Sequence, residues 1–510
     1  MAEFSLLSIY VAVSMSAVVI ALYYWFGKHS LRAIPTVGGS SLPFLSYTGS
    51  LKYVDNARAL LQEGYDKYKG KVFKIPMPDR WLVVVTGTRL VDELQKLPDD
   101  YASFSIGVGE LINTRYIFGD SFNKDPYHIA IIQKQLTRNI SNMFEALHDE
   151  TCSAVEDTIP NNTHGKRKST IHWVAVPALA TMENLIARIS SRVFVGPQYC
   201  RNRDYLHLAV NFARDVSKAR RFVGMFPPFL KRYAAKFVTD INPFVRRGIK
   251  LLGPAIMDRC NNVALYGSDY TDKPVDVLQW VVEAAVARGQ GPEEIMEMML
   301  LMNFASIFTT STSLTHALLH LAAEPAYVQM LREEVEQIVE AEGWSKGSMN
   351  KMRKLDSFLR ESQRYNGTNL VSITRMILKD FKFSDGTFLP AGTLAVAPVA
   401  STHRDAENYE DSANFDPLRF VKLRNEDGNG GVKYQFVATS VEYLSFGHGK
   451  HACPGRFFAS SELKGIVAHL VLNYDMKLER EGVRPRNWDN AFVVVPSPLA
   501  KILFRKRSNT

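Results

Sequence analysis

The sequence predicts a mainly helical α+β fold, for three reasons. Apolar residues recur three and four positions apart over most of residues 57–364, which is the period of helices packed on a core. Residues 366–400 are instead extended and rich in turn residues, and the run from Ser384 to Thr387 is typical of a hairpin. A glycine-rich loop and a final helix follow. We therefore expect one helix-rich domain with small β-sheets, whose longest helix covers residues 293–323.

The composition is that of an ordinary globular protein, with 46% hydrophobic and 22% charged residues in a chain of 510. Lys and Arg number 61 against 52 Asp and Glu, which gives a net charge of +9. This mild excess suits an anionic membrane surface or an acidic protein partner, and we expect no nucleic-acid partner. Only four cysteines occur, without a CxxC pair, which argues against a disulfide scaffold and a finger-type zinc site.

The first element is a predicted transmembrane anchor at residues 4–27, a stretch without any charged residue. A helix of this length rises about 36 Å, enough to cross a hydrocarbon core of about 30 Å. Glu3 precedes the stretch, and Lys28 and Arg32 follow it, so the rest of the chain is expected in the cytosol. A cleaved signal peptide is the competing interpretation, but its apolar region is shorter and follows basic residues.

Two further parts follow the anchor. Residues 28–56 contain four Pro and Gly residues within a short stretch, and we expect a hinge and connector there. Residues 57–510 show no internal repeat and no low-complexity tract, and we expect them to form a single large domain.

The loop around Cys453 carries the strongest chemical signal. It reads FGHGKHACPGRFFA from Phe446 onward, and its three glycines let the backbone bring several amide groups close to one sulfur. A helix is expected to begin just past the cysteine, and a helix N-terminus lowers a thiol pKa. A thiolate held by amides and packed under Phe446 is what an axial haem ligand requires. Two alternatives stay open, a buried structural thiol and a zinc site with His448 and His451.

The same run resembles the haem-binding signature of the cytochrome P450 family, Phe-x-x-Gly-x-x-x-Cys-x-Gly, and is similar to fungal microsomal members. The resemblance implies the P450 fold with one N-terminal transmembrane helix, and haem b bound with Cys453 as the axial ligand of its iron. Phe446 and Cys453 would thus belong to the cofactor site. Residues 57–510 would be the cytosol-facing haem-thiolate catalytic domain of a protein in the endoplasmic reticulum membrane.

A charge network is also implied by the resemblance. Glu361 and Arg364 fit the family's Glu-x-x-Arg, and Arg419 fits the arginine of a later element that reads Phe-Asp-Pro-Leu-Arg-Phe here. These three residues would form a buried network that braces the haem loop. Glu481 and Arg484 match the same short pattern, but we expect them in a solvated loop.

Two cations resemble partners of the haem propionates. They are Arg375, in an extended segment, and His451, two residues before the cysteine. The alternative for Arg375 is an ordinary surface arginine. The tryptophan-to-arginine contact that the family's early helices make with haem is not recognisable, and Gln133 and Lys134 receive no role.

The family's oxygen-handling motif, Ala-Gly-x-Asp/Glu-Thr-Thr, is altered in this chain and reads Ala-Ser-Ile-Phe-Thr-Thr. Thr309 occupies the catalytic hydroxyl position, whereas Phe308 replaces the acid and cannot relay protons. Waters held by Thr309, Thr310 or Ser306 would then carry them. The alternative for Thr309 is a hydroxyl that bonds back to its own helix.

Partners and substrate follow from the resemblance together with charge and hydropathy. The chain lacks a flavin or nicotinamide fingerprint, so electrons would come from NADPH through a separate NADPH-cytochrome P450 reductase. Lys450, Arg456 and Lys464 are candidates for its docking patch. Residues 218–236 contain basic and aromatic residues without an acid, which suits contact with membrane lipid; a packed core hairpin is the alternative.

The predicted function is that of a monooxygenase that inserts one oxygen atom from O2 into a lipophilic small molecule. Phe304, Ile307 and Phe308 would face the pocket without a charged anchor, so we expect a neutral, apolar substrate, a terpenoid or a steroid of fungal secondary metabolism. The alternative, motivated by Phe308, is a redox-neutral haem-thiolate isomerase or dehydratase that acts on a peroxide.

Overall fold

The computed structural model describes residues 31–39, 45–78, 80–118, 125–159, 173–226, 228–238, 240–267, 270–428 and 430–507. The predicted anchor at residues 4–27 lies outside these ranges. Within them, no helix combines the length and the apolar character that crossing a bilayer requires.

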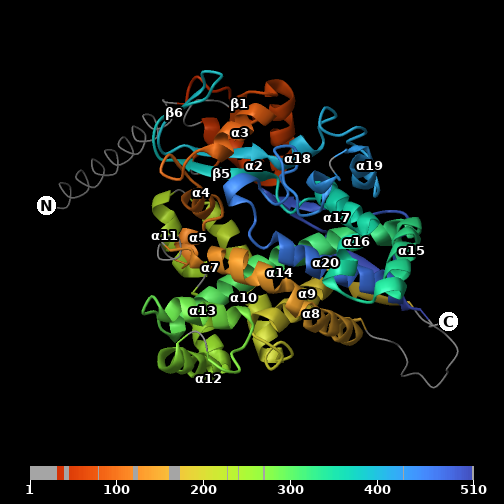
Figure 1. The fold of residues 1–510 in the computed structure, drawn as a ribbon. Helices are drawn as coiled ribbons and strands as arrows, with labels where there is room; N and C mark the ends of the chain where they lie inside the picture. Colours follow the sequence, from red (N-terminus) through yellow and green to blue (C-terminus); the bar gives the residue numbers. More distant parts are fainter. Residues whose placement is uncertain are drawn as a thin grey trace, which may run out of the picture.

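Helices make up most of the described chain (Figure 1). Those before the central helix are α2 (Leu45–Tyr68), α3 (Thr88–Lys96), α4 (Phe104–Leu111), α5 (Thr114–Phe118), α7 (Tyr127–Ala130), η1 (Ile131–Leu136), α8 (Thr137–Thr158), α9 (Ala178–Phe194), α10 (Arg203–Gly224), α11 (Pro228–Val238), α12 (Asn242–Tyr266) and α13 (Val277–Val286). The central helix and those after it are α14 (Pro292–Ala323), α15 (Pro325–Glu342), α16 (Lys346–Lys351), α17 (Arg353–Tyr365), α18 (Val399–His403), α19 (Arg419–Glu426), η2 (Val432–Tyr434), η3 (Gly449–His451) and α20 (Arg456–Asn473).

The strands form small sheets at the side of the helices. The largest has the order β1 (Val72–Pro76), β2 (Trp81–Val85), β8 (Leu394–Pro398), β5 (Val371–Ile377) and β3 (Ala102–Ser103), with β2 and β8 parallel and the other pairs antiparallel. The smaller sheets are β4 (Val174–Pro177) with β12 (Lys501–Lys506) and β9 (Tyr474–Leu478), β6 (Phe381–Lys382) with β7 (Phe388–Leu389), and β10 (Trp488–Asn490) with β11 (Val493–Val495). In Figure 1 the largest sheet lies at the top, beside α2 and α3.

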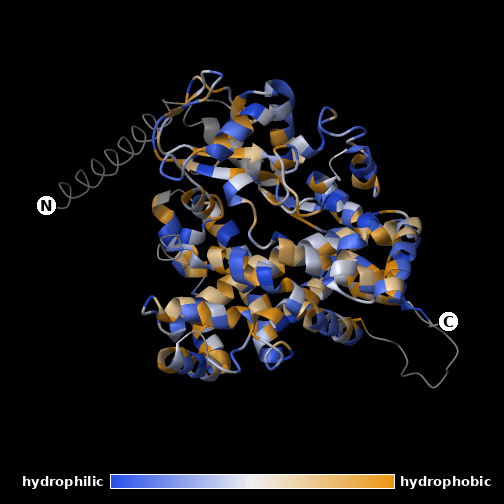
Figure 2. Ribbon diagram, viewed as in Figure 1, coloured by the Kyte–Doolittle hydropathy of each residue, from blue (hydrophilic) through white to orange (hydrophobic). Residues whose placement is uncertain are grey.

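The core is built around α14. This helix is apolar around most of its circumference, and a helix of that kind is buried on all sides. It packs against α9, α10, α12, α13, α17 and α20. Figure 2 shows that the outer helices carry hydrophobic and hydrophilic residues together, as helices with one buried face do.

Several predicted elements are confirmed. The longest helix runs from Pro292 to Ala323, β6 and β7 form the predicted hairpin, and α20 begins at Arg456, just past the cysteine. The helix-rich fold with small sheets is thus as predicted.

Two predictions were wrong in detail. β1 and β2 lie in the region that we expected to be helical. Both strands are fully buried, and the periodicity of apolar residues does not distinguish a buried strand from a buried helix, so the prediction missed them. The connector expected at residues 28–56 contains the beginning of α2, whose helical geometry breaks at Asn56, the end of that predicted segment.

Candidate cofactor site

The backbone around Cys453 turns sharply and is held by a short backbone hydrogen bond. Gly447 and Gly449 have positive φ angles of 68° and 71°, which favour glycine. A Cβ atom on Gly449 would lie 1.9 Å from the Oε1 atom of Gln95, so a larger residue there would also force the Gln95 side chain to shift. The Cys453 amide donates to the Phe446 carbonyl over 2.7 Å. The backbone of the loop therefore helps to fix the position of the cysteine.

The protonation of Cys453 differs from the prediction. Burial raises the pKa of its thiol, although the amides of Gly455 and Arg456 and the charge of Arg456 act in the opposite direction. The prediction of a lowered pKa was wrong because desolvation outweighs the helix N-terminus. A thiolate here therefore requires a further positive charge, and a metal ion that binds the sulfur supplies one.

α14 is buried along most of its length, but one turn near its middle has exposed side chains. Ala305 and Thr309 are exposed and lie one turn apart, whereas most of the helix is buried. The Thr309 hydroxyl donates to the Ala305 carbonyl over 2.7 Å, which is the bond back to its own helix that the sequence left as an alternative. Protein atoms therefore leave space beside this turn of α14.

The side chains of Arg375 and His451 both contact the ring of Phe104. The Arg375 guanidinium lies 5.7 Å from the ring centroid, and the His451 imidazole stacks on the ring at 4.9 Å. Arg375 is 1% exposed, so the alternative of a surface arginine is wrong. The Nε2 atom of His451 donates to Asp99 over 2.6 Å, and burial lowers the pKa of the ring, so Nδ1 donates to a second acceptor only when the ring is protonated.

Arg375 lacks a counter-ion among the described residues. Its guanidinium donates to the backbone carbonyls of Thr374 and Gln95 over 2.9 and 3.2 Å, and its Nε atom has no partner. Burial lowers its pKa to about 10, with partial compensation by Asp99. A buried cation without a partner is costly, and a carboxylate that arrives with a cofactor would remove the cost.

These residues fit haem better than a bare metal ion. Within the part of the chain that the structure describes, no group of three His, Cys, Asp or Glu side chains could hold a metal. The Nδ1 atom of His448 is bonded to Thr439 over 3.0 Å, and His451 is bonded to Asp99, so the zinc alternative finds no support. Haem needs only the sulfur from the protein on one side of its iron, and cations for its two carboxylates.

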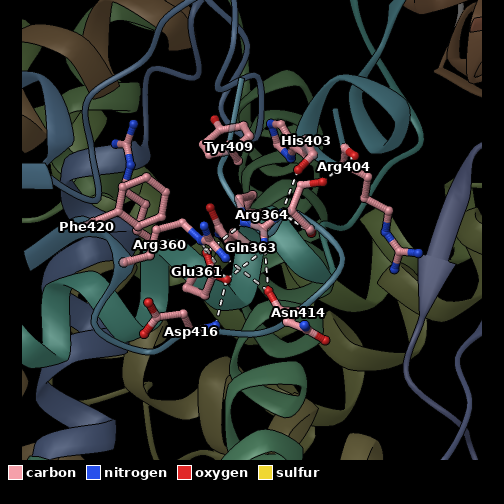
Figure 3. A network of polar contacts seen from close by, with 12 residues as sticks. Arg360, Glu361, Gln363, Arg364, His403, Arg404, Tyr409, Asn414, Asp416 and Phe420 are labelled. Carbon is pink, nitrogen blue, oxygen red and sulfur yellow. Dashed lines mark hydrogen bonds and ion pairs between the residues drawn. The ribbon is translucent and has the colours of Figure 1, made fainter. Parts of the chain in front are cut away.

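Glu361 lies at the centre of a buried charge network (Figure 3). Arg364 grips its carboxylate through Nε and Nη2, both at 2.7 Å, and Arg419 contacts both oxygens at 3.2 Å. The Asp416 amide donates to the same carboxylate over 3.0 Å. The three side chains predicted as a network are thus brought together. Their remaining donors reach backbone carbonyls, those of His403, Ser412 and Asn414 from Arg364 and those of Glu410, Asp411 and Asn414 from Arg419.

The network extends to the residues just before the cysteine loop. His403, whose carbonyl binds Arg364, accepts the Leu444 amide at its Nε2 atom over 2.9 Å. Tyr443 donates from its hydroxyl to the Arg360 carbonyl on α17 over 3.2 Å, and its ring stacks on His403. Burial lowers the pKa of His403 to about 3, so its ring stays neutral and able to accept. The loop therefore begins from a segment that is tied to α17.

Other predicted residues lie in unexpected places. Lys464 is buried and paired with Asp356, so it cannot contribute to an exposed docking patch. Arg456 is partly buried and donates to the Cys453 carbonyl over 2.8 Å, and only Lys450 of the predicted patch is exposed. Arg484, expected in a solvated loop, is bonded to the buried His316 over 2.8 Å.

A buried acid near α14 was missed by sequence reasoning. Glu462 on α20 accepts a hydrogen bond from Ser190 on α9 over 2.7 Å, and Ser190 contacts Ser306 on α14 at 3.1 Å. The other carboxyl oxygen of Glu462 has no partner. Burial raises the pKa of Glu462 to about 8, so the group is neutral at pH 7. Glu462, Ser190 and Ser306 lie singly on three different helices, so no local sequence pattern predicts that they are in contact.

Comparison with known proteins agrees with this geometry. Residues 38–504 match the family model described as Cytochrome P450. Cytochrome P450 monooxygenase 151 of Postia placenta is 44% identical over 488 residues, which cover 95% of this chain and 96% of the relative. Cytochrome P450 monooxygenase CYP512U6 of Ganoderma lucidum is 38% identical, with 96% and 95% covered. The ent-kaurene oxidase of Gibberella intermedia is 31% identical, with 93% and 88% covered.

Glu361→Ala tests the network. The change leaves Arg364 and Arg419 buried without their common anion, which costs on the order of 3–5 kcal/mol. We expect protein that retains little haem, measured as haem content per chain and as thermal stability. Glu481→Ala is the matched control, because Glu481 belongs to the same short sequence pattern but is exposed. Full haem loading of Glu361→Ala would contradict the bracing role.

Glu462→Gln tests the buried acid through the pH dependence of stability. Between about pH 4.5 and 8 the carboxyl ionises in the unfolded chain but not in the folded protein, so it lowers stability as pH rises, by up to about 1.4 kcal/mol per unit. We expect the variant to lose this slope, measured as urea unfolding at several pH values. Exposed Glu479→Gln is the control. An identical slope in Glu462→Gln and wild type would show that Glu462 is not held neutral.

Proposed function

We propose that this chain, which belongs to the cytochrome P450 family, inserts one oxygen atom from O2 into a lipophilic small molecule, with electrons from NADPH. The observation that carries the proposal is the pairing of a tightly turned cysteine loop with a buried cation, Arg375, that lacks a counter-ion. The similar proteins named as monooxygenases support the reaction class. They do not favour the redox-neutral isomerase or dehydratase.

The residues have distinct tasks in holding the cofactor. The sulfur of Cys453 would bind the haem iron, and Arg375 would pair with the propionates, with His451 as a second partner when its ring is protonated at Nδ1. When bound, haem supplies the redox chemistry with dioxygen. Phe446 holds Cys453 through its carbonyl, whereas its ring packs edge-on to Phe436 at 5.4 Å.

Proton supply is the task of the residues on and near α14. The Thr309 hydroxyl donates its proton to Ala305, so its oxygen is free to accept a hydrogen bond from a water. Phe308 neither holds nor moves a proton. Glu462 holds one at neutral pH and reaches Ser306 on α14 through Ser190. We propose that this chain of groups replaces the missing acid as the source of protons for waters beside Thr309.

The partner and the substrate class are part of the same proposal. Electrons would come from NADPH-cytochrome P450 reductase, because the sequence has no fingerprint for binding flavin or nicotinamide. A terpenoid or steroid substrate is supported by the similarity to the protein named ent-kaurene oxidase, although one fold serves many substrates.

We further propose that the protein resides in the endoplasmic reticulum membrane, with its anchor at residues 4–27 and α11 as a second contact. Phe229, Tyr233 and Phe237 are exposed and four residues apart, so they share one face of α11. Phe237 is 88% exposed. An apolar helix face with basic neighbours and no acid is suited to the lipid surface.

Thr309→Ala tests the reaction. In a reconstituted system with reductase and NADPH, we expect NADPH consumption to continue while product falls and hydrogen peroxide rises, because the hydroxyl no longer holds water. Thr315→Ala is the matched control, since Thr315 makes the same bond back to its helix, over 2.7 Å to Ser311, but is buried. Turnover of a peroxide substrate without NADPH or reductase would instead establish the isomerase alternative.

Removal of residues 1–27 tests the second membrane contact. We expect the truncated protein to retain partial binding to vesicles of anionic and neutral phospholipid in a flotation assay. Replacement of Phe229 and Phe237 by Ser in the same truncated chain should abolish that binding, because the apolar face is lost. Phe388→Ser, at an exposed phenylalanine of the β6–β7 hairpin, is the control. Complete release on truncation alone would refute the contact at α11.

A further inference from the structure

Arg220 near the end of α10 is a second cation without a counter-ion. Its guanidinium lies 5.8 Å from the centroid of the Phe308 ring on α14. Among the described residues, no side-chain or backbone acceptor is within hydrogen-bond distance of this guanidinium, and no carboxylate is within 4 Å. Its surface is partly accessible, yet burial lowers its pKa to about 10. Arg220 is therefore surrounded by protein on most sides but keeps some accessible surface.

The helix around Arg220 places this charge on an apolar face. Val216 and Val223, one turn before and after it, are fully buried. The Arg220 carbonyl accepts a hydrogen bond from the Asn113 amide over 3.2 Å, and Asn113 in turn accepts one from the buried Lys231 over 2.8 Å. The backbone that carries Arg220 is thus tethered to the segment before α5. Arg221, the next residue, is exposed and lies over the Trp488 ring at 5.4 Å.

The contact with Phe308 does not compensate for the burial of this charge. A cation over an aromatic ring gains less free energy than an ion loses when it is taken out of water. A guanidinium in a confined space is therefore suited to an anion that enters it, and its planar fork matches a carboxylate. Phe308 precedes Thr309, so such an anion would lie in the pocket beside the exposed turn of α14.

We propose that Arg220 is a substrate anchor, and that the pocket takes lipophilic carboxylates, molecules with a large apolar body and one carboxylate that pairs with Arg220. This inference rests on the proposed function, and it replaces the expectation from the sequence that the substrate is neutral and has no charged anchor. A terpenoid or fatty acid, whose carboxylate is ionised at pH 7, has the required chemistry. Arg220 would hold the carboxylate in one position. This would determine which part of the apolar body lies beside Thr309.

The test compares acids with their uncharged esters. The full-length holoenzyme is titrated at pH 7.4 with dodecanoic acid and methyl dodecanoate, and with dehydroabietic acid and its methyl ester, and the change of the Soret band from low spin to high spin gives a Kd. For at least one pair we expect the acid to bind ten-fold or more tightly than the ester. Arg220→Gln should abolish this preference with little change for the ester, and Arg220→Lys should keep part of it.

Two controls separate this inference from simpler explanations. Arg221→Gln removes the neighbouring exposed charge and should leave the preference unchanged; an equal loss in both variants would indicate general attraction to a basic surface and overturn the assignment. Loss of haem from Arg220→Gln and Arg220→Lys would show that Arg220 serves the cofactor instead. Equal binding of acids and esters by wild type, or a response to none of the four compounds, would also overturn it.

Loss of the role of Arg220 and loss of the proposed function would give different spectroscopic results. A carbon monoxide difference spectrum reports the thiolate ligand of reduced haem independently of any substrate. If that spectrum is normal and the acids are not preferred, only the role of Arg220 falls. If the thiolate spectrum is absent from the wild-type holoenzyme, the proposed function falls as well.

Discussion

The carboxylate of Glu361 is the constraint on which the rest of the site depends. It is buried between two arginines that also bind the backbone of residues 403–414. Glu361 and Arg364 lie on one face of α17. This single helix therefore binds the long irregular segment of residues 403–414, whose backbone forms few hydrogen bonds of the kind found in helices and sheets. Leu444 donates to His403 in this segment, and Tyr443 donates to the Arg360 carbonyl on α17. The cysteine loop starts from these two residues. The position of the sulfur is thus set by charges far from it in sequence.

Buried charges in this protein fall into two groups that differ in their partners. Arg364, Arg419 and Lys464 each contact a buried carboxylate, Glu361 or Asp356, so their charge is balanced within the chain. Among the described residues, Arg360, Arg375 and Arg220 have no such carboxylate. An ion pair costs little once it is complete, whereas a lone buried charge is strongly unfavourable. The first group is therefore structural. Arg360 is also structural, because it lies over the rings of Phe420 and Tyr443 and donates to backbone carbonyls. For Arg375 and Arg220 we propose anions from outside the chain, the cofactor at Arg375 and the substrate at Arg220.

Sequence reasoning succeeded where the chemistry is local. The cysteine loop, the beginning of α20 and the Glu361 network follow from short patterns. It failed where burial or distant contacts decide the outcome. Lys464 looks like a solvated charge until Asp356 is placed beside it, and the thiol pKa of Cys453 depends on depth, which the pattern of glycines does not reveal. The link from Glu462 through Ser190 to Ser306 joins residues 272 and 116 positions apart, and only the packing of three helices brings them together.

The phenylalanine at position 308 connects these observations. An acid there would stand beside Arg220, which lies 5.8 Å from the ring that replaces it, and the two would form an ion pair at the edge of the pocket. Arg220 would then have no free charge for a substrate. Phe308 leaves the guanidinium unpaired and still gives its side chain a surface to pack on. The same change removes a proton donor from α14, and the neutral Glu462 supplies one from α20 through Ser306. We propose that Phe308 thereby leaves the supply of protons to Glu462 on α20 and leaves Arg220 available to an anion.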